Sequence, residues 1–381
     1  MNVAVVNLTA GGFSAGYRKY LDAILPRLAS SPRVGRLHVF SPMQARGMFP
    51  NDAGDQLFWS SSDAYRGYRS VRAAIQRAAP DIVFIPTARW LDVGGTPSVV
   101  MVRNMEPLLQ PFVGNGVLES LRNTARRYAA QRACRQATRI IAVSNHVRDY
   151  LIAEWAIPID NIGVVYHGVD IPSSDDSVTR PRTLPANIET SPYLFTAGSI
   201  RPARGLEDAV SALAVLIERG IRIPLVIAGA VTGSASYRGR IRALAKAVGV
   251  ERQIMWAGQL SASEISWCHQ HCAAFVMTSR VEACPNTALE ALAHGSITVS
   301  STRPPMPEFF GDAALYYLAG DAASLANALG VVLAMDSDER QRMARRGIAL
   351  AHEFTWSRAT EMTLDQLERC CEPSPALLTA S

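Results

Sequence analysis

Lysine is almost absent from this sequence of 381 residues, in which Lys19 and Lys246 are the only two. The formal net charge of +5 at pH 7 therefore comes almost wholly from arginine, whose planar guanidinium suits the recognition of phosphate and carboxylate groups. A coding bias toward arginine would produce the same count. The basic residues are spread too widely to predict a nucleic-acid-binding surface, because such surfaces gather them on one face. We therefore expect no nucleic-acid partner.

Long hydrophobic runs are also missing. No apolar run approaches the roughly 20 residues that a membrane-spanning helix needs. The first residues, MNVAVVNLTAGG, lack the basic segment that opens a secretory signal peptide, and their short apolar run predicts a buried strand instead. With 48% hydrophobic and 19% charged residues, the composition is that of an ordinary globular protein. These features predict a cytoplasmic protein.

The six cysteines suggest no disulfide framework, and we expect no metal site. Cys268 and Cys272 enclose two histidines in the stretch CHQHC, which invites a zinc interpretation. The preceding SASE pattern predicts a helix, however, on which Cys268 and Cys272 share one face while His269 points elsewhere. Zinc sites need convergent ligands, so buried thiols are the preferred interpretation. Asp175 and Asp176 lie in a predicted linker, where no metal role is expected.

Short apolar segments alternate with helical stretches along the whole sequence. Strands are predicted at residues 3–8, 37–40, 81–85, 99–102, 140–143 and 163–166, and again at residues 193–197, 225–228, 254–256, 274–277, 297–300 and 314–317. Strands separated by helices form parallel, doubly wound sheets whose ligand sites lie at the carboxyl ends of the strands. The predicted organisation is a first domain at residues 1–171, a linker at 172–192, a second domain at 193–355, and a helical segment at 356–381 that packs back toward the first domain. No G-x-G-x-x-G opens either domain, which disfavours a dinucleotide oxidoreductase.

Residues 282–295, EACPNTALEALAHG, concentrate the features of a ligand site. Asn286 or Thr287 is expected to cap a helix that Gly295 ends, which places Glu282 on the preceding loop and Glu290 in the first turn. Backbone amides at such a helix start bind phosphate, and carboxylates bind hydroxyl groups. The alternative is that Thr287 and Glu290 form a capping box without chemical function. The same pattern recurs at residues 261–264, where no function is suspected.

Six sequence blocks in fixed order resemble a known family. They are AGSIRPARGLEDAVSA at residues 197–212, LVIAGA at 225–230, WAGQLSASEI at 256–265, TSRVEACPNTALEALAHG at 278–295, MPEFFGDAALYY at 306–317 and FTW at 354–356. Two further stretches, at residues 142–151 and 164–170, resemble the family's domain junction. The blocks resemble the glycosyltransferase group 1 family, retaining enzymes of GT-B architecture. The resemblance implies an α/β fold of two doubly wound, Rossmann-like domains facing across a cleft.

The resemblance also implies a nucleotide-sugar site around Glu282 and Glu290, which match the family's E-x7-E motif. Glu290 would bind the ribose hydroxyls and Glu282 would face the sugar, in keeping with the hydrogen bonds that a carboxylate accepts from a diol. The other residues implied on the donor side are Ala283, Cys284, Pro285, Asn286, Thr287, Ser199, Gly11 and Gly12. The two glycines follow the first predicted strand, and a plain turn is the alternative there.

A cation is expected beside the donor's diphosphate, because the family stabilises the leaving group without a metal or other cofactor. Arg204 stands where the family usually carries a lysine, so Glu282 and Arg204 are the predicted catalytic residues. A second cation of the family, an arginine, is missing because Ser199 follows Gly198 in this sequence. Arg201 is the candidate replacement.

Arg103, Asn104 and Glu106 follow the strand predicted at residues 99–102, where many relatives carry a His-Asp pair near the sugar. Without that histidine no general base is implied, and the three residues are candidates to line the acceptor side. A structural role at a strand end is the alternative.

Further along the sequence, a predicted helical stretch contains several arginines: Arg122, Arg126, Arg127, Arg132, Arg135 and Arg139. A solvated helix face is the plain interpretation, and peripheral contact with an anionic membrane is the sharper one.

The sequence thus predicts a glycosyltransferase that moves a hexosyl group from a nucleoside-diphosphate sugar to a hydroxyl of a glycan or lipid-linked glycan, in bacterial surface polysaccharide synthesis. An epimerase or phosphorylase of the same fold is one alternative, and a non-catalytic nucleotide-sugar-binding protein is another. The departures at Arg103 and Ser199 keep the last alternative open. The sugar, the base and the acceptor depend on pocket shape, which motifs do not predict.

Overall fold

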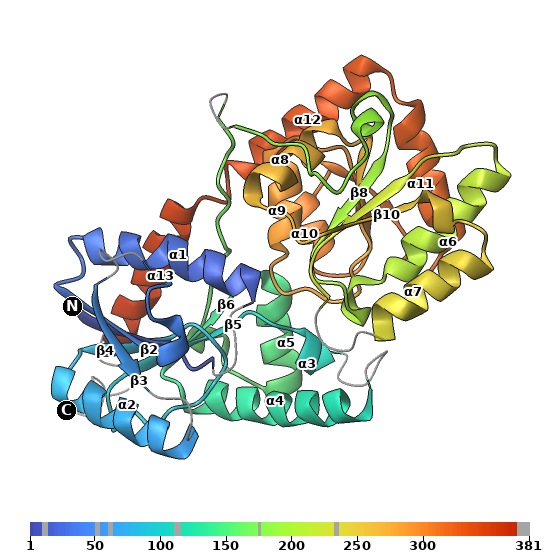
Figure 1. The fold of residues 1–381 in the computed structure, drawn as a ribbon. Coiled ribbons are helices and arrows are strands. Elements are labelled where there is room, and N and C mark those ends of the chain that lie inside the picture. The colour runs from blue at the N-terminus through green and yellow to red at the C-terminus, as the bar shows by residue number, and fades with distance from the viewer. Residues whose placement is uncertain are drawn as a thin grey trace. The chain divides into compact units, whose positions relative to one another are not determined.

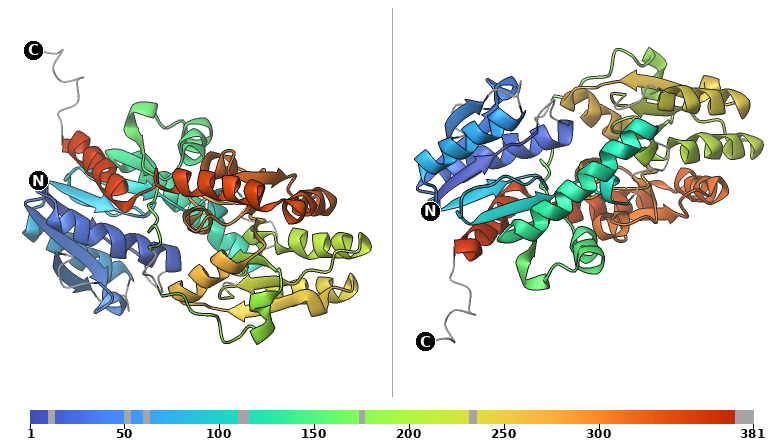
Figure 2. Two further views of the ribbon diagram at one scale, coloured as in Figure 1. Left: turned by 90° about the horizontal axis from the view of Figure 1, so that it is seen from above. Right: turned by 90° about the horizontal axis from the view of Figure 1, so that it is seen from below.

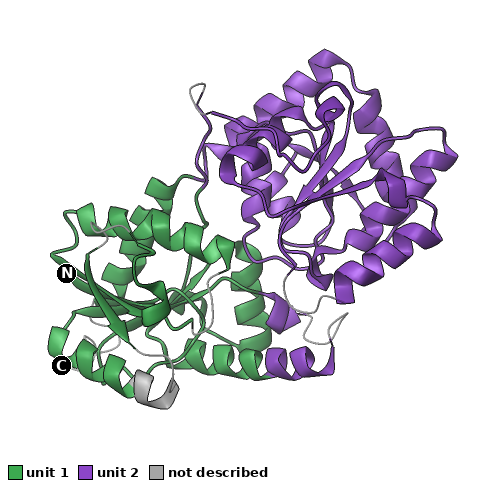
Figure 3. Cartoon of the chain, viewed as in Figure 1, with its two compact units in different colours: residues 1–104, 125–168, 355–381 green, residues 105–124, 169–354 purple. Residues whose placement is uncertain are grey.

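The computed structural model describes residues 1–9, 14–49, 54–59, 64–109, 116–173, 177–231 and 236–371, and for residues 64–68 the backbone alone. The chain divides into two compact units (Figure 3). Unit 1 consists of Met1–Asn104, Ala125–Gly168 and Thr355–Ser381, and unit 2 of Met105–Thr124 and Val169–Phe354. Residues 177–192, part of the predicted linker, belong to unit 2, where Leu184 and Ile188 are buried.

The described part of unit 1 contains a parallel sheet of seven strands in the order β3-β2-β1-β4-β5-β6-β7 (Figure 1). The strands are β1 (Asn2–Val6), β2 (Arg36–Pro42), β3 (Asp55–Trp59), β4 (Ile82–Ile85), β5 (Ser98–Val102), β6 (Arg139–Ala142) and β7 (Ile162–Val164). The central strands are runs of buried valine and isoleucine, as expected where helices cover both faces of a sheet. The strand order reverses between β1 and β4, the position at which doubly wound sheets bind ligands.

The helices of unit 1 are α1 (Ala15–Ser30), α2 (Ala64–Ala78), most of α4 (Val117–Gln136), α5 (Asn145–Trp155) and α13 (Trp356–Cys371). Ser14 caps α1 by accepting a hydrogen bond from the Tyr17 amide. The last helix, α13, packs against α1 and against strands β4, β5 and β6 (Figures 1 and 2). Gly168 allows this approach, because a Cβ there would lie 2.3 Å from the backbone nitrogen of Trp356.

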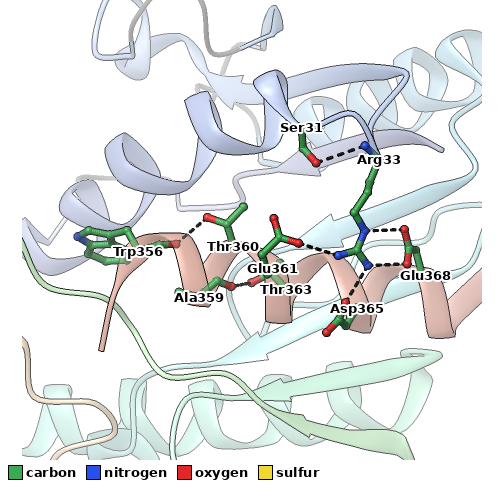
Figure 4. A network of polar contacts seen from close by, with 9 residues as sticks. All are labelled: Ser31, Arg33, Trp356, Ala359, Thr360, Glu361, Thr363, Asp365 and Glu368. Atoms are coloured by element: carbon green, nitrogen blue, oxygen red, sulfur yellow. Dashed lines mark hydrogen bonds and ion pairs between the residues drawn. The ribbon is translucent and has the colours of Figure 1, made fainter. Parts of the chain in front are cut away.

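An arginine fastens α13 to the rest of unit 1 (Figure 4). The Arg33 guanidinium, on the turn before β2, bonds Glu361 at 2.9 Å, Asp365 at 2.7 Å and Glu368 at 2.8 Å. The hydrogen bond from Arg33 holds the pKa of Glu368 below its usual range. The three carboxylates lie on successive turns of α13, so a single cation aligns the helix along its length.

The described part of unit 2 contains a parallel sheet of six strands in the order β10-β9-β8-β11-β12-β13 (Figure 1). The strands are β8 (Leu194–Ala197), β9 (Leu225–Ala228), β10 (Ile254–Gly258), β11 (Ala274–Met277), β12 (Thr298–Ser301) and β13 (Ala314–Tyr317). The helices are α3 (Glu106–Leu109), α6 (Leu206–Glu218), α7 (Ser236–Ala247), α8 (Ala262–His271), α9 (Asn286–Ala293), α10 (Met306–Phe310), α11 (Ala322–Ala334) and α12 (Ser337–Ala351). Helices α6, α7 and α11 pack their apolar faces on one side of the sheet. Strand order reverses between β8 and β11.

Short 3-10 helices complete the secondary structure: η1 (Met43–Ala45), η2 (Ile159–Asn161), η3 (Ala186–Thr190), η4 (Pro202–Arg204) and η5 (Glu251–Gln253).

The prediction of an α/β protein with two doubly wound sheets is confirmed, and most predicted strands lie within one or two residues of the observed ones. The edge strand β3 (Asp55–Trp59) was not predicted. Within the described ranges, no helix has the length and hydrophobicity to cross a membrane, and no three His, Cys, Asp or Glu side chains gather as metal ligands do. Cys268 and Cys272 are free thiols, and burial raises the pKa of each to about 12.

Candidate functional site

Backbone segments pack closely at the carboxyl edge of the unit 2 sheet, around the point where the strand order reverses. Gly198 follows β8 and Gly229 follows β9, with φ of +131° and +139°. A Cβ on Gly229 would lie 1.9 Å from the Gly198 carbonyl oxygen, and one on Gly205 would lie 2.5 Å from the Thr278 carbonyl oxygen. Side chains at these positions would separate the loops, so the glycines permit close packing of the backbone.

Arg204 and Glu282 meet at this edge. Arg204 lies at the end of the loop after β8 and Glu282 on the loop after β11, and the arginine Nη1 donates to Glu282 Oε1 at 2.7 Å. Ser279 joins them: its Oγ donates to the same Oε1 at 2.9 Å and accepts from Arg204 Nη1 at 3.1 Å. The two charged side chains are only 15% and 12% exposed. The structure therefore brings both predicted catalytic residues into one polar cluster.

The contacts with described residues leave polar atoms of both charged side chains without a hydrogen-bond partner. Arg204 Nε is buried and has no hydrogen-bond partner within the described part of the chain. The hydrogen bonds that Glu282 accepts from described residues both end at Oε1, which leaves Oε2 available. Glycine suits position 198, because its φ is +131° and a Cβ there would lie 2.6 Å from the Arg204 guanidinium carbon.

Hydrogen bonds to backbone carbonyls hold the two loops together independently of these charges. Thr278 Oγ1 donates to the Arg204 carbonyl at 2.7 Å, and the Arg280 amide donates to the Ala203 carbonyl at 2.8 Å. Ser301, at the end of β12, donates to the Ser279 carbonyl at 2.8 Å. Because three strands contribute to this network, the cluster is preorganised.

A second polar network adjoins the loop after β11 and is centred on Asp208. It was not predicted from the sequence. Asp208 is buried in α6 and accepts hydrogen bonds from the Tyr317 hydroxyl at 2.9 Å and the Gly320 amide at 2.8 Å. Burial and the Asp208 carboxylate both raise the pKa of Tyr317 well above its usual value, so the phenol is a neutral donor. Arg280 Nη2 lies 3.6 Å from both Asp208 and Glu207. These groups support the loop that carries Glu282.

Helix α9 begins differently from the sequence prediction. Its N-cap is Pro285, which makes no side-chain capping bond, and the helix runs from Asn286 to Ala293. The predicted cap at Asn286 or Thr287 is therefore wrong, and Glu290 lies in the second turn instead of the first. Proline has no side-chain oxygen, and the loop after β11 determines where the helix starts. Thr287 lies inside the helix instead of at its N-cap, so Thr287 and Glu290 do not form the capping box of the alternative interpretation.

The matching SASE pattern does form a capping box. Ser261 accepts from the Glu264 amide, and the Glu264 carboxylate accepts from the Ser261 amide. These bonds lower the pKa of Glu264. The same four-residue pattern therefore caps α8, whereas at α9 it does not form a capping box.

The donor-side candidates at residues 283–287 lie at the start of α9. Ala283 is buried, whereas Cys284, Asn286 and Thr287 are half-buried. Ser199 is half-buried on the loop after β8. Gly11 and Gly12 lie outside the described residues.

The acceptor-side candidates fall on both sides of the division between the units, which lies after Asn104. Glu106 belongs to unit 2, where its carboxylate pairs with Arg201 Nη1 at 2.5 Å. Arg103 belongs to unit 1, where its guanidinium carbon lies 3.7 Å from the centre of the Tyr17 ring. Asn104 is exposed at the end of the same loop.

Two doubly wound, Rossmann-like units with charged residues at the switch point of the second are the GT-B arrangement of nucleotide-sugar-dependent glycosyltransferases. Residues 183–349 match the family model described as Glycosyl transferases group 1, and residues 32–172 match Glycosyltransferase Family 4. Residues 183–349 therefore form a domain of the group 1 glycosyltransferase family.

Curated relatives share part of this chain. A D-inositol 3-phosphate glycosyltransferase of Corynebacterium aurimucosum is 28% identical over 58% of this chain and 54% of its own length. The O-antigen chain mannosyltransferase B of Escherichia coli is 25% identical over 59% of each chain. The chain therefore spans just over half the length of these relatives.

Solved structures share the fold over nearly the whole chain. Anabaena Alr3699/HepE in complex with UDP-glucose has a TM-score of 0.76 at 16% identity, covering 96% of this chain and 99% of that one. A glycosyltransferase from Rickettsia africae has a TM-score of 0.73 at 13% identity, covering 98% and 100%.

Proposed function

We propose that the protein is a retaining glycosyltransferase. It moves a hexosyl group from a nucleoside-diphosphate sugar to a hydroxyl of a glycan or lipid-linked glycan, in the synthesis of bacterial surface polysaccharide. The observation that carries the proposal is the Arg204–Glu282–Ser279 cluster at the switch point of unit 2. The relative from Escherichia coli, an O-antigen chain mannosyltransferase by name, supports the biological setting.

In the proposed reaction Arg204 offsets the negative charge that develops on the departing diphosphate. Its guanidinium is held by Glu282 and Ser279, so it need not reorganise as the charge forms. The bond between the anomeric carbon and the phosphate oxygen breaks, and its electron pair leaves with the diphosphate. The acceptor oxygen bonds to the same face of the anomeric carbon and transfers its proton to that phosphate oxygen.

The two glutamates have separate roles in this proposal. Glu290, in the second turn of α9, binds the ribose hydroxyls of the donor. Glu282 accepts a hydroxyl of the transferred sugar at Oε2, the oxygen that the hydrogen bonds from Arg204 and Ser279 leave available. The amides at the start of α9 and the Arg204 cation supply positive charge for the diphosphate, so we propose a reaction that is independent of metal and other cofactors.

Product analysis with and without an acceptor tests the proposed reaction. The protein is incubated with a panel of nucleotide-sugars, and sugar products are followed by mass spectrometry and NMR. We expect turnover that requires a glycan acceptor and retains the anomeric configuration. A ligand at 100 times its dissociation constant should also stabilise the fold by about 2.7 kcal/mol. Conversion of the sugar without an acceptor would indicate an epimerase. Release of a sugar phosphate from a glycan supplied with inorganic phosphate would indicate a phosphorylase, and stabilisation without any turnover a binding protein.

The exposed face of α4 supports a contact with an anionic membrane surface. Val117, Leu118, Leu121 and Tyr128 are 81%, 63%, 62% and 69% exposed on this helix. Arginines follow along the same helix at positions 122, 126, 127, 132 and 135, against a single acidic residue, Glu119. Apolar side chains flanked by guanidinium groups fit the boundary between lipid headgroups and acyl chains. We propose that this face holds the enzyme at the inner leaflet, where lipid-linked acceptors are found.

Cosedimentation with vesicles tests the membrane contact. We expect the wild-type protein to bind phosphatidylglycerol-containing vesicles more tightly than pure phosphatidylcholine vesicles. The double variant Leu118→Ser/Leu121→Ser should weaken binding about thirtyfold or more, since each buried leucine contributes roughly 1 kcal/mol or more. Val331→Ser is the matched control, because Val331 is 54% exposed on α11. Equal binding of both variants would show that α4 does not contact the bilayer.

A further inference from the structure

Unit 1 has a ligand edge of its own, where β1 and β4 mark the reversal of strand order. Leu8 follows β1, Arg89 follows β4 and Arg103 follows β5, so all three lie at the carboxyl edge of the sheet. Doubly wound sheets bind their ligands at such a position. Two arginines therefore stand where a ligand of unit 1 is expected.

Arg103 is a largely buried cation without an anionic partner among the described residues. Its guanidinium stacks 3.7 Å from the centre of the Tyr17 ring, and its Nε is buried without a hydrogen-bond partner within the described ranges. Burial lowers the pKa of Arg103, and the charge of Arg89 lowers it further, while Tyr17 and Tyr20 act in the opposite direction. An arginine remains charged in proteins, and a buried charge without a counter-charge is costly.

Arg89 adds a second positive charge to the same place. Its Nη1 donates to the Leu8 carbonyl at 2.8 Å, which directs the side chain toward the end of β1. Both guanidinium groups lie close enough to Tyr17 to lower its pKa, although burial raises that pKa more strongly. Neither arginine forms an ion pair with a described carboxylate. In unit 2, by contrast, Arg201 pairs with Glu106 and Arg204 with Glu282.

Two guanidinium groups without carboxylates call for an anion, because neutral sugar hydroxyls would leave both charges uncompensated. A phosphoryl group carries up to two negative charges and accepts bidentate hydrogen bonds from arginine, and a carboxylate accepts them with one charge. The Tyr17 ring beneath Arg103 fixes the guanidinium plane, which preserves the geometry for such bonds.

We propose that Arg89 and Arg103 form an anion-binding site in unit 1 that holds a phosphoryl or carboxylate group of the acceptor. This inference rests on the proposed transferase activity and narrows its acceptor to anionic molecules.

Binding of inorganic phosphate tests the site without any turnover. Phosphate and pyrophosphate are titrated into the wild-type protein, Arg103→Gln and Arg89→Gln, with calorimetry and thermal shift as readouts. We expect each substitution to weaken anion binding at least tenfold. Arg36→Gln is the matched control, because Arg36 begins β2 at the opposite edge of the same sheet and pairs with Asp55 at 3.3 Å. Unchanged phosphate affinity in both test variants would overturn the anion site. If Arg103→Gln fails to fold, the phosphate affinity of Arg89→Gln decides the outcome, because Arg89 is only half-buried.

Transfer kinetics with paired acceptors then identify the source of the anion. The same glycan is supplied with and without a phosphate or carboxylate group. We expect the wild-type protein to have an acceptor KM at least tenfold lower for the anionic form. That preference should vanish in Arg103→Gln while the donor KM stays unchanged. Equal use of both acceptors by the wild-type protein, with phosphate binding intact, would overturn the acceptor assignment and indicate a site for free phosphate. Absence of all transfer, with phosphate binding lost in Arg103→Gln, would refute the proposed function and support the anion site.

Discussion

Replacing Arg204 with glutamine is expected to lower the kcat of sugar transfer about 10²–10³-fold, the usual effect of removing one preorganised charge-stabilising donor from a transition state. The guanidinium is needed most when the diphosphate leaves, so kcat and kcat/KM should fall together while the donor KM changes little. Arg204→Lys should recover part of the rate, because it retains the charge but loses the paired contacts with Glu282 and Ser279. Rates are measured with saturating donor and acceptor.

A loss of stability must be separated from this loss of rate. Arg204→Gln leaves the Glu282 carboxylate, 12% exposed, without its cation, which is expected to lower the free energy of unfolding by about 1–3 kcal/mol. The double variant Arg204→Gln/Glu282→Gln removes both charges, so its stability should recover while its rate stays low. Arg219→Gln is the control, because Arg219 is exposed at the far end of α6. A wild-type rate in Arg204→Gln would refute the assigned role.

Replacing Glu290 with alanine is expected to raise the donor KM about 10²-fold or more. In the proposed complex, the Glu290 carboxylate accepts hydrogen bonds from two ribose hydroxyls. Hydrogen bonds to charged groups contribute about 1.5–3 kcal/mol each. The ribose is remote from the reacting bond, so these contacts serve ground state and transition state alike and kcat should change less. At donor concentrations well below KM, turnover falls with kcat/KM.

Donors that lack a ribose hydroxyl make this prediction specific. A 2′- or 3′-deoxyribose donor should be poor for the wild-type protein, whereas Glu290→Ala should use it as well as it uses the natural donor. Glu264→Ala is the matched control, because the hydrogen bonds that the Glu264 carboxylate accepts from described residues all belong to the capping box of α8. It is expected to cost about 1 kcal/mol of stability without altering the donor KM. If Glu290→Ala retained the wild-type preference for the intact ribose, Glu290 would not be the ribose ligand.

The sequence predicted most of the fold because the central strands are continuous apolar runs between helices. Strand β3 has a weaker signal: Asp55 and Gln56 open it, and its exposure alternates along a sheet edge. Its pairing with β2 is a tertiary property that composition does not reveal. The start of α9 was misjudged for a related reason. Local preference favours Asn286 or Thr287 as a cap, but the loop after β11 sets the boundary at Pro285.

At the candidate site, too, the sequence did not predict contacts between residues that are distant along the chain. Glu282, Glu290 and Arg204 were found because motif spacing identifies them, but their partners come from distant parts of the chain. Nothing local indicates that Ser279 bridges Arg204 and Glu282, or that Arg201 pairs with Glu106 across nearly a hundred residues. Arg89 was missed, although an arginine shortly after a buried strand is a recognisable signal at the carboxyl edge of a parallel sheet.

The assignment of α13 to unit 1 has a consequence for biosynthesis. All the described strands of unit 1 precede residue 165, yet the helix that covers β4, β5 and β6 begins at Trp356. At about 5–20 residues per second, the ribosome needs roughly 10–40 s to translate the intervening chain. During that interval the nascent sheet keeps an apolar face uncovered, whereas the strands and main helices of unit 2 emerge as one continuous stretch. Chaperone capture and aggregation of incomplete chains should therefore concentrate on the amino-terminal sheet.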